Sequence, residues 1–95
     1  MMQGDNVTII TGASRGIGEA IALRLAEEKH NLMLFGRDEE KLKNVAGHVE
    51  ETTGVNAEYF VGDVADQQFV DKSVKTIVEK YGKVDNLINN AGMAI

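Results

Sequence analysis

The stretch Thr11-Gly12-Ala13-Ser14-Arg15-Gly16-Ile17-Gly18 governs the interpretation of the whole chain. The β-branched run at residues 7–10 precedes it and is typical of a buried strand, and residues 19–28 follow it with the composition of a helix. Three glycines at a strand-to-helix turn are unfavourable unless another group must approach the backbone closely. A phosphate is such a group, because backbone N–H groups and the positive end of a helix bind anions. The stretch therefore predicts a phosphate-binding turn.

The composition narrows the class of protein. A chain of 95 residues forms one domain at most, and α/β nucleotide-binding folds are usually larger. The net charge of −5 argues against a nucleic-acid partner, which favours a basic surface. The absence of cysteine excludes disulfides, thiolate catalysis and cysteine metal sites. With no signal-peptide pattern at residues 1–6 and no run long enough to cross a membrane, we expect a cytoplasmic protein without a membrane partner.

Short apolar strands alternate with amphipathic helices along the chain. Strands are predicted at residues 7–10, 31–35, 55–61 and 84–88. The helices between them are bounded by predicted N-caps and C-terminal glycines, namely Asp38, Asp66, Gly54 and Gly82. The order βαβαβαβ predicts an α/β fold with a parallel sheet and right-handed crossovers. A doubly wound, Rossmann-like sheet would have the strand order 3-2-1-4.

Apolar stripes on the three helices predict which residues face the sheet. They comprise Ile17, Ala20, Ile21 and Leu25 in the first helix, Leu42, Val45, Ala46 and Val49 in the second, and Val70, Val74, Ile77, Val78 and Tyr81 in the third. The fourth strand would lie at an edge of the sheet, although its residues Leu87 and Ile88 are apolar and no helix of the chain follows them. The predicted sheet is therefore incomplete.

Two loops are predicted to meet at one crevice. In doubly wound sheets the ligand binds outside the carboxyl ends of the strands, where the strand order reverses. Here that point lies between the first and fourth strands, so the glycine turn would face the loop Asn89-Asn90-Ala91-Gly92. This pairing favours a dinucleotide as the ligand.

Three motifs together resemble the short-chain dehydrogenase/reductase family. They are Thr11-Gly12-x-x-x-Gly16-x-Gly18, Gly62-Asp63-Val64 and Asn89-Asn90-Ala91-Gly92. The chain is similar to the N-terminal half of enzymes in the NADP-dependent branch of that family, which includes 3-oxoacyl-carrier-protein reductases and ketone reductases. The resemblance implies an oxidoreductase that transfers a hydride between NADP(H) and a small-molecule carbonyl or alcohol substrate. It also implies that residues 1–95 are the N-terminal portion of an NAD(P)-binding Rossmann domain, ending before the catalytic half of a homo-oligomeric enzyme.

The resemblance also implies a set of cofactor-binding residues. Those lining the pyrophosphate and the adenosine ribose would be Gly12, Ser14, Arg15 and Ile17, with Gly16 and Gly18 allowing close approach and helix–strand packing. Asp63 would accept a hydrogen bond from the adenine amino group and Val64 would back the ring. Asn90, Ala91 and Gly92 would pass along the ribose and stabilise the centre of the sheet. Two structural alternatives stay open, because Asp63 could prepare the next helix and Asn89 could bond local backbone.

The choice of cofactor depends on the end of the second strand. NAD enzymes usually place a carboxylate there to bind the ribose hydroxyls, whereas this chain has Gly36 followed by Arg37. A guanidinium suits the 2′-phosphate of NADP, and Arg15 could contact the same phosphate. The spacing from Gly18 to Asp38 would instead favour NAD, but Asp38 is accounted for as an N-cap. NADP is therefore the predicted cofactor.

The remaining polar residues supply no catalytic group or metal site. His30 and His48 have no acidic neighbours at metal-ligand spacing, so both are interpreted as structural. The family's proton donor lies in the motif Tyr-x-x-x-Lys, and neither Tyr59 nor Tyr81 has a lysine at that offset. The chain alone is therefore expected to bind the cofactor weakly at best and to lack turnover. Two other classes remain, a non-catalytic nucleotide-sensing protein and an assembly-prone fragment that pairs through its fourth strand.

Overall fold

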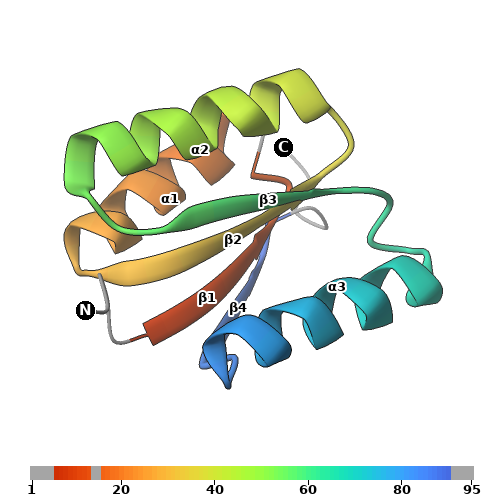
Figure 1. Cartoon of the computed structure of the whole chain (residues 1–95). Coiled ribbons are helices and arrows are strands. Elements are labelled where there is room, and N and C mark those ends of the chain that lie inside the picture. The colour runs from red at the N-terminus through yellow and green to blue at the C-terminus, as the bar shows by residue number, and fades with distance from the viewer. Residues whose placement is uncertain (1–5, 14–15, 91–95) are drawn as a thin grey trace.

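The computed structural model describes residues 6–13 and 16–90. Strands and helices alternate in the order β1 (Asn6–Thr11), α1 (Gly16–Glu27), β2 (His30–Gly36), α2 (Glu39–Thr53), β3 (Ala57–Val61), α3 (Gln67–Tyr81) and β4 (Asn86–Asn89). All strand pairs are parallel, and the order across the sheet is β3-β2-β1-β4. Both the doubly wound α/β class and the predicted strand order are thus confirmed. Helices α1 and α2 lie together on one face of the sheet and α3 lies on the other (Figure 1).

Side chains of the two central strands alternate between two apolar cores. On the α1 and α2 face, Ile10, Leu32 and Leu34 are fully buried against α2 and α1 residues. On the α3 face, the buried set is Val7, Ile9, Met33, Phe35 and Ile77. Each fully buried aliphatic side chain contributes about 1.5–3 kcal/mol of burial free energy. Because β1 and β2 are covered on both faces, their sequences are nearly continuous apolar runs.

The predicted helix ends are confirmed. The carboxylates of Asp38 and Asp66 each accept backbone N–H bonds in the first turn of the following helix, at 3.1 Å from Lys41 and 3.0 Å from Gln68. Both C-terminal glycines have left-handed backbone conformations, with φ of 80° at Gly54 and 82° at Gly82. A side chain would be strained at either position, which explains why a glycine stands at the end of each helix.

Two strand starts lie later than predicted. Strand β3 begins at Ala57 rather than residue 55, and the N–H of the preceding Asn56 donates to the Asn31 side-chain oxygen at 3.3 Å. Strand β4 begins at Asn86 rather than residue 84, and the carboxylate of the preceding Asp85 accepts the Val7 N–H at 2.8 Å. That backbone bond lowers the pKa of Asp85. In both places a side chain takes the position of a ladder partner, so regular pairing starts only afterwards.

The helix stripes were predicted with unequal success. All four stripe residues of α2 are buried. In α3, Ser73 and Ile77 face the sheet, whereas Val78 is 42% exposed. In α1 the buried residues are Gly18, Ala22 and Ala26, with Ile21 and Leu25 partly buried, and Ile17 and Ala20 are exposed. Small residues allow the backbone of α1 to approach the sheet closely, and a count of large apolar residues overlooks this kind of contact.

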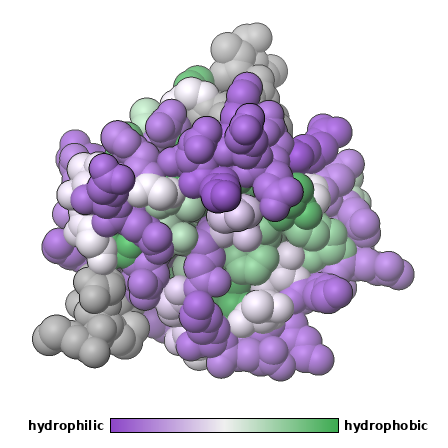
Figure 2. All heavy atoms as spheres, turned by 45° about the horizontal axis from the view of Figure 1, so that its top comes forward, coloured by the Kyte–Doolittle hydropathy of each residue, from purple (hydrophilic) through white to green (hydrophobic). Residues whose placement is uncertain are grey.

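Strand β4 is an edge of the sheet, as predicted. In the described part of the chain it pairs only with β1, and its Leu87 is 61% exposed. Figure 2 shows another view of the surface, where hydrophilic residues predominate and apolar ones gather in a patch right of the centre. Within residues 6–13 and 16–90, no helix is long and apolar enough to cross a membrane.

At the end of the sheet where the strands begin, here called the amino edge, Glu58 joins β3 to the C-terminal end of α3. Its Oε2 lies 2.8 Å from the Lys80 ammonium and accepts a hydrogen bond from the Tyr81 hydroxyl. Partial burial opposes ionisation of Glu58, but the bonds from Lys80 and Tyr81 outweigh it and lower the pKa of Glu58. Burial, followed by the bond to Glu58, raises the pKa of Tyr81. Tyr81 is therefore a structural phenol at the edge opposite the glycine turn.

We predict that Glu58→Gln destabilises the fold in a pH-dependent manner. Because the pKa of Glu58 is below its ordinary value of 4.5 in the folded chain, its contribution is complete above that pH and is lost as the pH falls through the folded-state pKa. Urea unfolding at neutral pH should show a loss of about 1 kcal/mol, since the ion pair is partly exposed. The difference from wild type should shrink as the pH falls below 4.5 and through the lowered folded-state pKa, beyond which Glu58 is protonated in both states.

The matched control is Glu79→Gln, which removes an exposed carboxylate from α3, the helix that carries Lys80 and Tyr81. Its unfolding free energy should stay within about 0.5 kcal/mol of wild type at both pH values. An equal loss in the two variants, or a Glu58→Gln effect that does not change with pH, would contradict the role given to Glu58.

Candidate functional site

The carboxyl ends of β1 and β4 bring the two predicted loops together. Strand β1 pairs with β2 on one side and with β4 on the other, so the strand order reverses at β1. In the β1–β4 register Thr11 lies opposite Asn89, and the Thr11 hydroxyl donates to Asn89 Oδ1 at 3.0 Å. The loops that follow these strands therefore start side by side, as the sequence predicted. Asn89 thus bonds a side chain of the neighbouring strand rather than the local backbone that its structural alternative named.

A buried hydrogen bond joins the glycine turn to the β4 loop. Asn90 Nδ2 donates to the Gly12 carbonyl oxygen at 3.2 Å, and Asn90 is only 3% exposed. Gly12 has a φ of 66°, a conformation that favours glycine. The side chain of Asn90 thus helps to fix the backbone of the turn, a role that the sequence indicated only as stabilisation of the sheet centre.

Gly18 and Gly16 are glycines for different reasons. A Cβ on Gly18 would lie 2.4 Å from the Gly12 oxygen and 2.8 Å from the Ala13 Cα, so a methyl group cannot fit between α1 and the turn. A Cβ on Gly16 would meet nothing within 4 Å, and this residue is exposed at the first position of α1. Packing within the described residues accounts for Gly18 but leaves Gly16 open to a ligand. The adjacent Ile17 is 45% exposed.

At the end of β2, Arg37 and Asp38 have distinct environments. Asp38 is the N-cap of α2, which accounts for its carboxylate as predicted. Arg37 is exposed and forms no ion pair with any described residue. Gly36 is buried, and its carbonyl accepts the Gly62 N–H at 2.9 Å, so the ends of β2 and β3 are fixed to each other. The structure therefore leaves a cationic side chain available at this edge.

The loop after β3 is a compact turn that leads into α3. Asp63 Oδ1 accepts the Ala65 N–H at 2.8 Å, and the Asp63 carbonyl accepts the Asp66 N–H at 2.9 Å. This geometry supports the structural interpretation of Asp63 for one carboxylate oxygen. Oδ2 accepts no hydrogen bond within the part of the chain that the structure describes. Val64, in the same loop, is partly buried against the core on the α3 face of the sheet.

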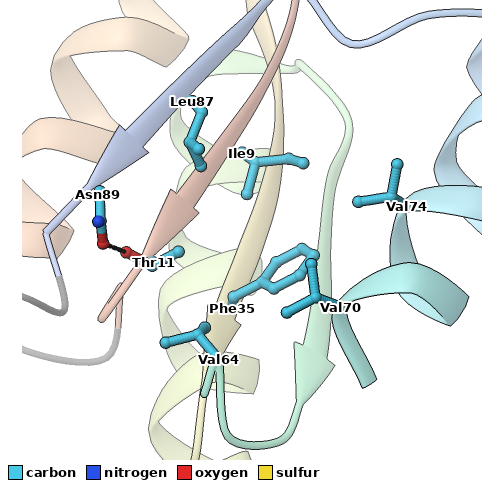
Figure 3. A pocket seen from close by; sticks show the side chains of 8 residues that line it. All are labelled: Ile9, Thr11, Phe35, Val64, Val70, Val74, Leu87 and Asn89. Carbon is cyan, nitrogen blue, oxygen red and sulfur yellow. Dashed lines mark hydrogen bonds between the residues drawn. The ribbon is translucent and has the colours of Figure 1, made fainter. Parts of the chain in front are cut away.

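A pocket of about 230 Å³ lies between α3 and the sheet (Figure 3). Its apolar lining residues are Ile9, Phe35, Val64, Val70, Val74 and Leu87, and its polar ones are Thr11 and Asn89. No side chain in this lining titrates, so the pocket alone supplies no acid, base or metal ligand. The sequence did not predict it, although an apolar β4 without a covering helix was the available signal.

The other sequence candidates fall outside this edge or outside the described residues. His30 Nδ1 lies 2.8 Å from the Thr8 hydroxyl, at the amino edge, and His48 is exposed on α2. Among residues 6–13 and 16–90, no group of three or more histidine or acidic side chains could hold a metal. The structure does not describe four predicted cofactor residues, namely Ser14, Arg15, Ala91 and Gly92.

Comparisons with known proteins agree with this geometry. A family profile described as short chain dehydrogenase matches residues 6–95. An uncharacterized oxidoreductase of Staphylococcus saprophyticus is 37% identical over 91 residues, which cover 96% of this chain and 39% of the relative. This chain thus spans about two-fifths of that relative's length.

Solved structures with a similar fold carry different cofactors. L-sorbose reductase from Gluconobacter frateurii, in complex with NADPH and L-sorbose, superimposes with a TM-score of 0.87 at 36% identity. The match covers 100% of this chain and 37% of the reductase chain. An NAD⁺-bound xylitol dehydrogenase has a TM-score of 0.88 at 39% identity, covering 98% of this chain and 35% of its own.

The two glycines of the turn give a matched pair of predicted outcomes. Gly18→Ala should lower the free energy of unfolding by about 1–3 kcal/mol, because its methyl group overlaps the backbone of the turn. Gly16→Ala should leave it within about 0.5 kcal/mol of wild type, since its methyl group enters open space. Urea denaturation measures both values. Equal destabilisation by the two variants would contradict the packing described for α1.

Proposed function

The chain belongs to the short-chain dehydrogenase/reductase family, and we propose that it forms the cofactor-anchoring half of an NADP-dependent oxidoreductase. In this proposal residues 1–95 are the N-terminal portion of a Rossmann domain whose remaining part lies in a longer protein. The complete enzyme transfers a hydride between NADP(H) and a small-molecule carbonyl or alcohol. The cofactor supplies the hydride when bound, and the residues of this chain bind and orient it.

The observation that carries this proposal is the arrangement of the glycine turn. Asn90 fixes the Gly12 backbone, while Gly16 lies at the start of α1 with open space beside it. The first N–H groups of a helix have no partners within the helix, so a pyrophosphate bound beside Gly16 would satisfy them. The residues proposed to contact this part of the cofactor are Gly12, Ser14, Arg15, Gly16 and Ile17. Gly18 permits the close packing of α1 that the site requires.

The adenine and ribose would lie along the neighbouring strand ends. Asp63 Oδ2 is proposed to accept a hydrogen bond from the adenine amino group, with Val64 against the ring. Oδ1 already holds the loop through Ala65, so the carboxylate has a fixed orientation. Asn90, Ala91 and Gly92 are proposed to line the path of the ribose. In this arrangement Asn90 acts through the backbone of Gly12, since its own amide is buried.

NADP is favoured over NAD by the chemistry at the end of β2. Arg37 is an exposed guanidinium without an ion-pair partner among the described residues, and no carboxylate occupies the position of Gly36. A planar guanidinium can donate two hydrogen bonds to the 2′-phosphate, which NAD lacks. Arg15 is proposed to contact the same phosphate. The similar L-sorbose reductase was solved with NADPH, but the similar xylitol dehydrogenase was solved with NAD⁺, so the proposal depends on Arg37.

The proton-transfer group is proposed to come from the remainder of the longer protein. Tyr81 is engaged by Glu58 at the amino edge, and neither tyrosine of this chain has a lysine four positions later. We therefore assign no catalytic residue to this chain and expect no turnover from it alone. The complete protein is proposed to be a homo-oligomer, as the family resemblance implies.

We predict that Arg37→Asp reverses the cofactor preference. Wild type should bind NADPH at least tenfold more tightly than NADH, because the guanidinium gains a charged partner only with NADPH. The variant should lose most of its NADPH affinity through repulsion between its carboxylate and the phosphate, whereas NADH binding should be retained or improved. Calorimetric or fluorescence titration of both reduced cofactors measures these affinities.

Two control variants separate charge from position. Lys75→Asp makes the same charge change on an exposed site of α3, on the opposite face of the sheet from α2, and should preserve the NADPH preference. Gly16→Ala should weaken both cofactors alike, because its methyl group would enter the space proposed for the shared pyrophosphate. A wild type that prefers NADH, or an Arg37→Asp variant that still prefers NADPH, would contradict the assignment.

A further inference from the structure

Phe69 packs directly on the backbone of the loop that follows β3. A Cβ built on Gly62 would lie 2.5 Å from the Cδ1 and Cε1 atoms of the Phe69 ring, so the ring occupies the space where a side chain would be. Phe69 also contacts Phe35, with ring centroids 5.6 Å apart and planes tilted by 60°. Since Phe35 is only 2% exposed at the end of β2, the Phe69 ring bridges the loop and the buried core.

Most hydrogen bonds of this loop lie within the loop or lead into α3. The Asp63 carboxylate bonds Ala65, and the Asp66 carboxylate accepts the N–H groups of Gln68 and Phe69 at 3.0 and 3.4 Å. The backbone bond from Gly62 to the Gly36 carbonyl, at 2.9 Å, joins the start of the loop to the sheet. Beyond that bond, the loop rests on the side chains packed against it, and the Phe69 ring supplies the three atoms nearest to the Gly62 Cβ position.

We infer that Phe69 is a positioning residue for the adenine end of the cofactor, acting through the Gly62–Val64 backbone. This inference rests on the proposed function, in which Asp63 and Val64 contact the adenine. Phe69 itself is on α3, beneath the loop, and is partly buried in the core on that face of the sheet. Removing the ring would let the loop settle toward the core and withdraw the Asp63 carboxylate from the adenine. A displacement of about 1 Å is enough to weaken a directional contact strongly.

Phe60 provides a matched control from the same aromatic cluster. Its ring contacts Phe35 with centroids 5.2 Å apart, but it is not among the atoms nearest to the Gly62 Cβ position. Phe60→Leu and Phe69→Leu therefore remove similar apolar volume from one cluster, and only the second removes the ring whose atoms lie nearest to the Gly62 Cβ position. Leucine is preferred to alanine because it keeps most of the packing volume and the variants are expected to fold.

The test is a titration of the isotopically labelled chain, followed by amide NMR, with adenosine 2′,5′-bisphosphate and with inorganic pyrophosphate. Phe69→Leu should weaken adenosine 2′,5′-bisphosphate about tenfold and leave pyrophosphate within twofold, because pyrophosphate has no adenine. Phe60→Leu should leave both within twofold. In the free protein, Phe69→Leu should speed the amide hydrogen exchange of residues 62–66 more than Phe60→Leu does. Equal effects of the two variants on the bisphosphate would overturn the inference.

A compensating pair gives a second readout. Gly62→Ala should displace the loop, because the new methyl group overlaps the Phe69 ring, and it should weaken the bisphosphate. Adding Phe69→Leu should restore part of that affinity by removing the overlapping atoms, and an additive loss would overturn the inference. A wild type that binds no adenine nucleotide would contradict the proposed function. The amide hydrogen exchange of the free variants would then still decide whether Phe69 positions the loop, and unchanged exchange rates at residues 62–66 would reject it.

Discussion

The hydrogen bond from Asn90 to the Gly12 carbonyl is the contact on which the candidate site depends. It joins segments 78 positions apart in sequence, and it is buried, so its loss would leave the Gly12 carbonyl without this partner. The absence of a side chain at Gly18 makes the contact feasible, because a Cβ there would lie 2.4 Å from the same oxygen and 3.1 Å from Asn90 Nδ2. The turn, the start of α1 and the end of β4 therefore fit together as one unit.

The amino edge of the sheet, where its strands begin, and the carboxyl edge, where they end, differ in what their polar groups bind. At the amino edge, Glu58 is paired with Lys80 and Tyr81, and Asp85 with Lys83 and the Val7 N–H. These groups form contacts within the chain that hold its strands and helices together. At the carboxyl edge, Arg37 has no ion pair within the described residues and Gly16 faces open space. An edge that holds its charged groups in internal pairs stabilises the fold, whereas one with available donors is suited to an anionic ligand such as a nucleotide.

Much of the fold could be predicted because local chemistry and topology agree. Asp38, Asp66, Gly54 and Gly82 mark helix ends by mechanisms confined to one turn, and the βαβ alternation limits the strand order. The errors arose where distant groups decide the outcome. The side chains of Asn31 and Asp85 take ladder positions just before β3 and β4 begin, and the small residues of α1 pack closer than a stripe of large residues suggests.

The candidate site was predictable only as a set of loops at one edge. Their convergence follows from the strand order, but the inward amide of Asn90, the ring of Phe69 under Gly62 and the pocket beside α3 arise from side-chain packing. No spacing rule encodes these contacts, because each joins residues from different elements. The structure therefore adds to the implied place of Asn90 beside the ribose a second role, which is to hold the turn in shape.

The most direct test maps NADPH onto the amide spectrum of the labelled chain. Binding at the carboxyl edge should shift signals of residues 12, 16–18, 36–37, 62–64 and 89–90, while those of Glu58, Tyr81 and Asp85 at the amino edge stay in place. Shifts centred on the amino edge, or no shifts at saturating NADPH, would contradict the claim that this chain anchors the cofactor.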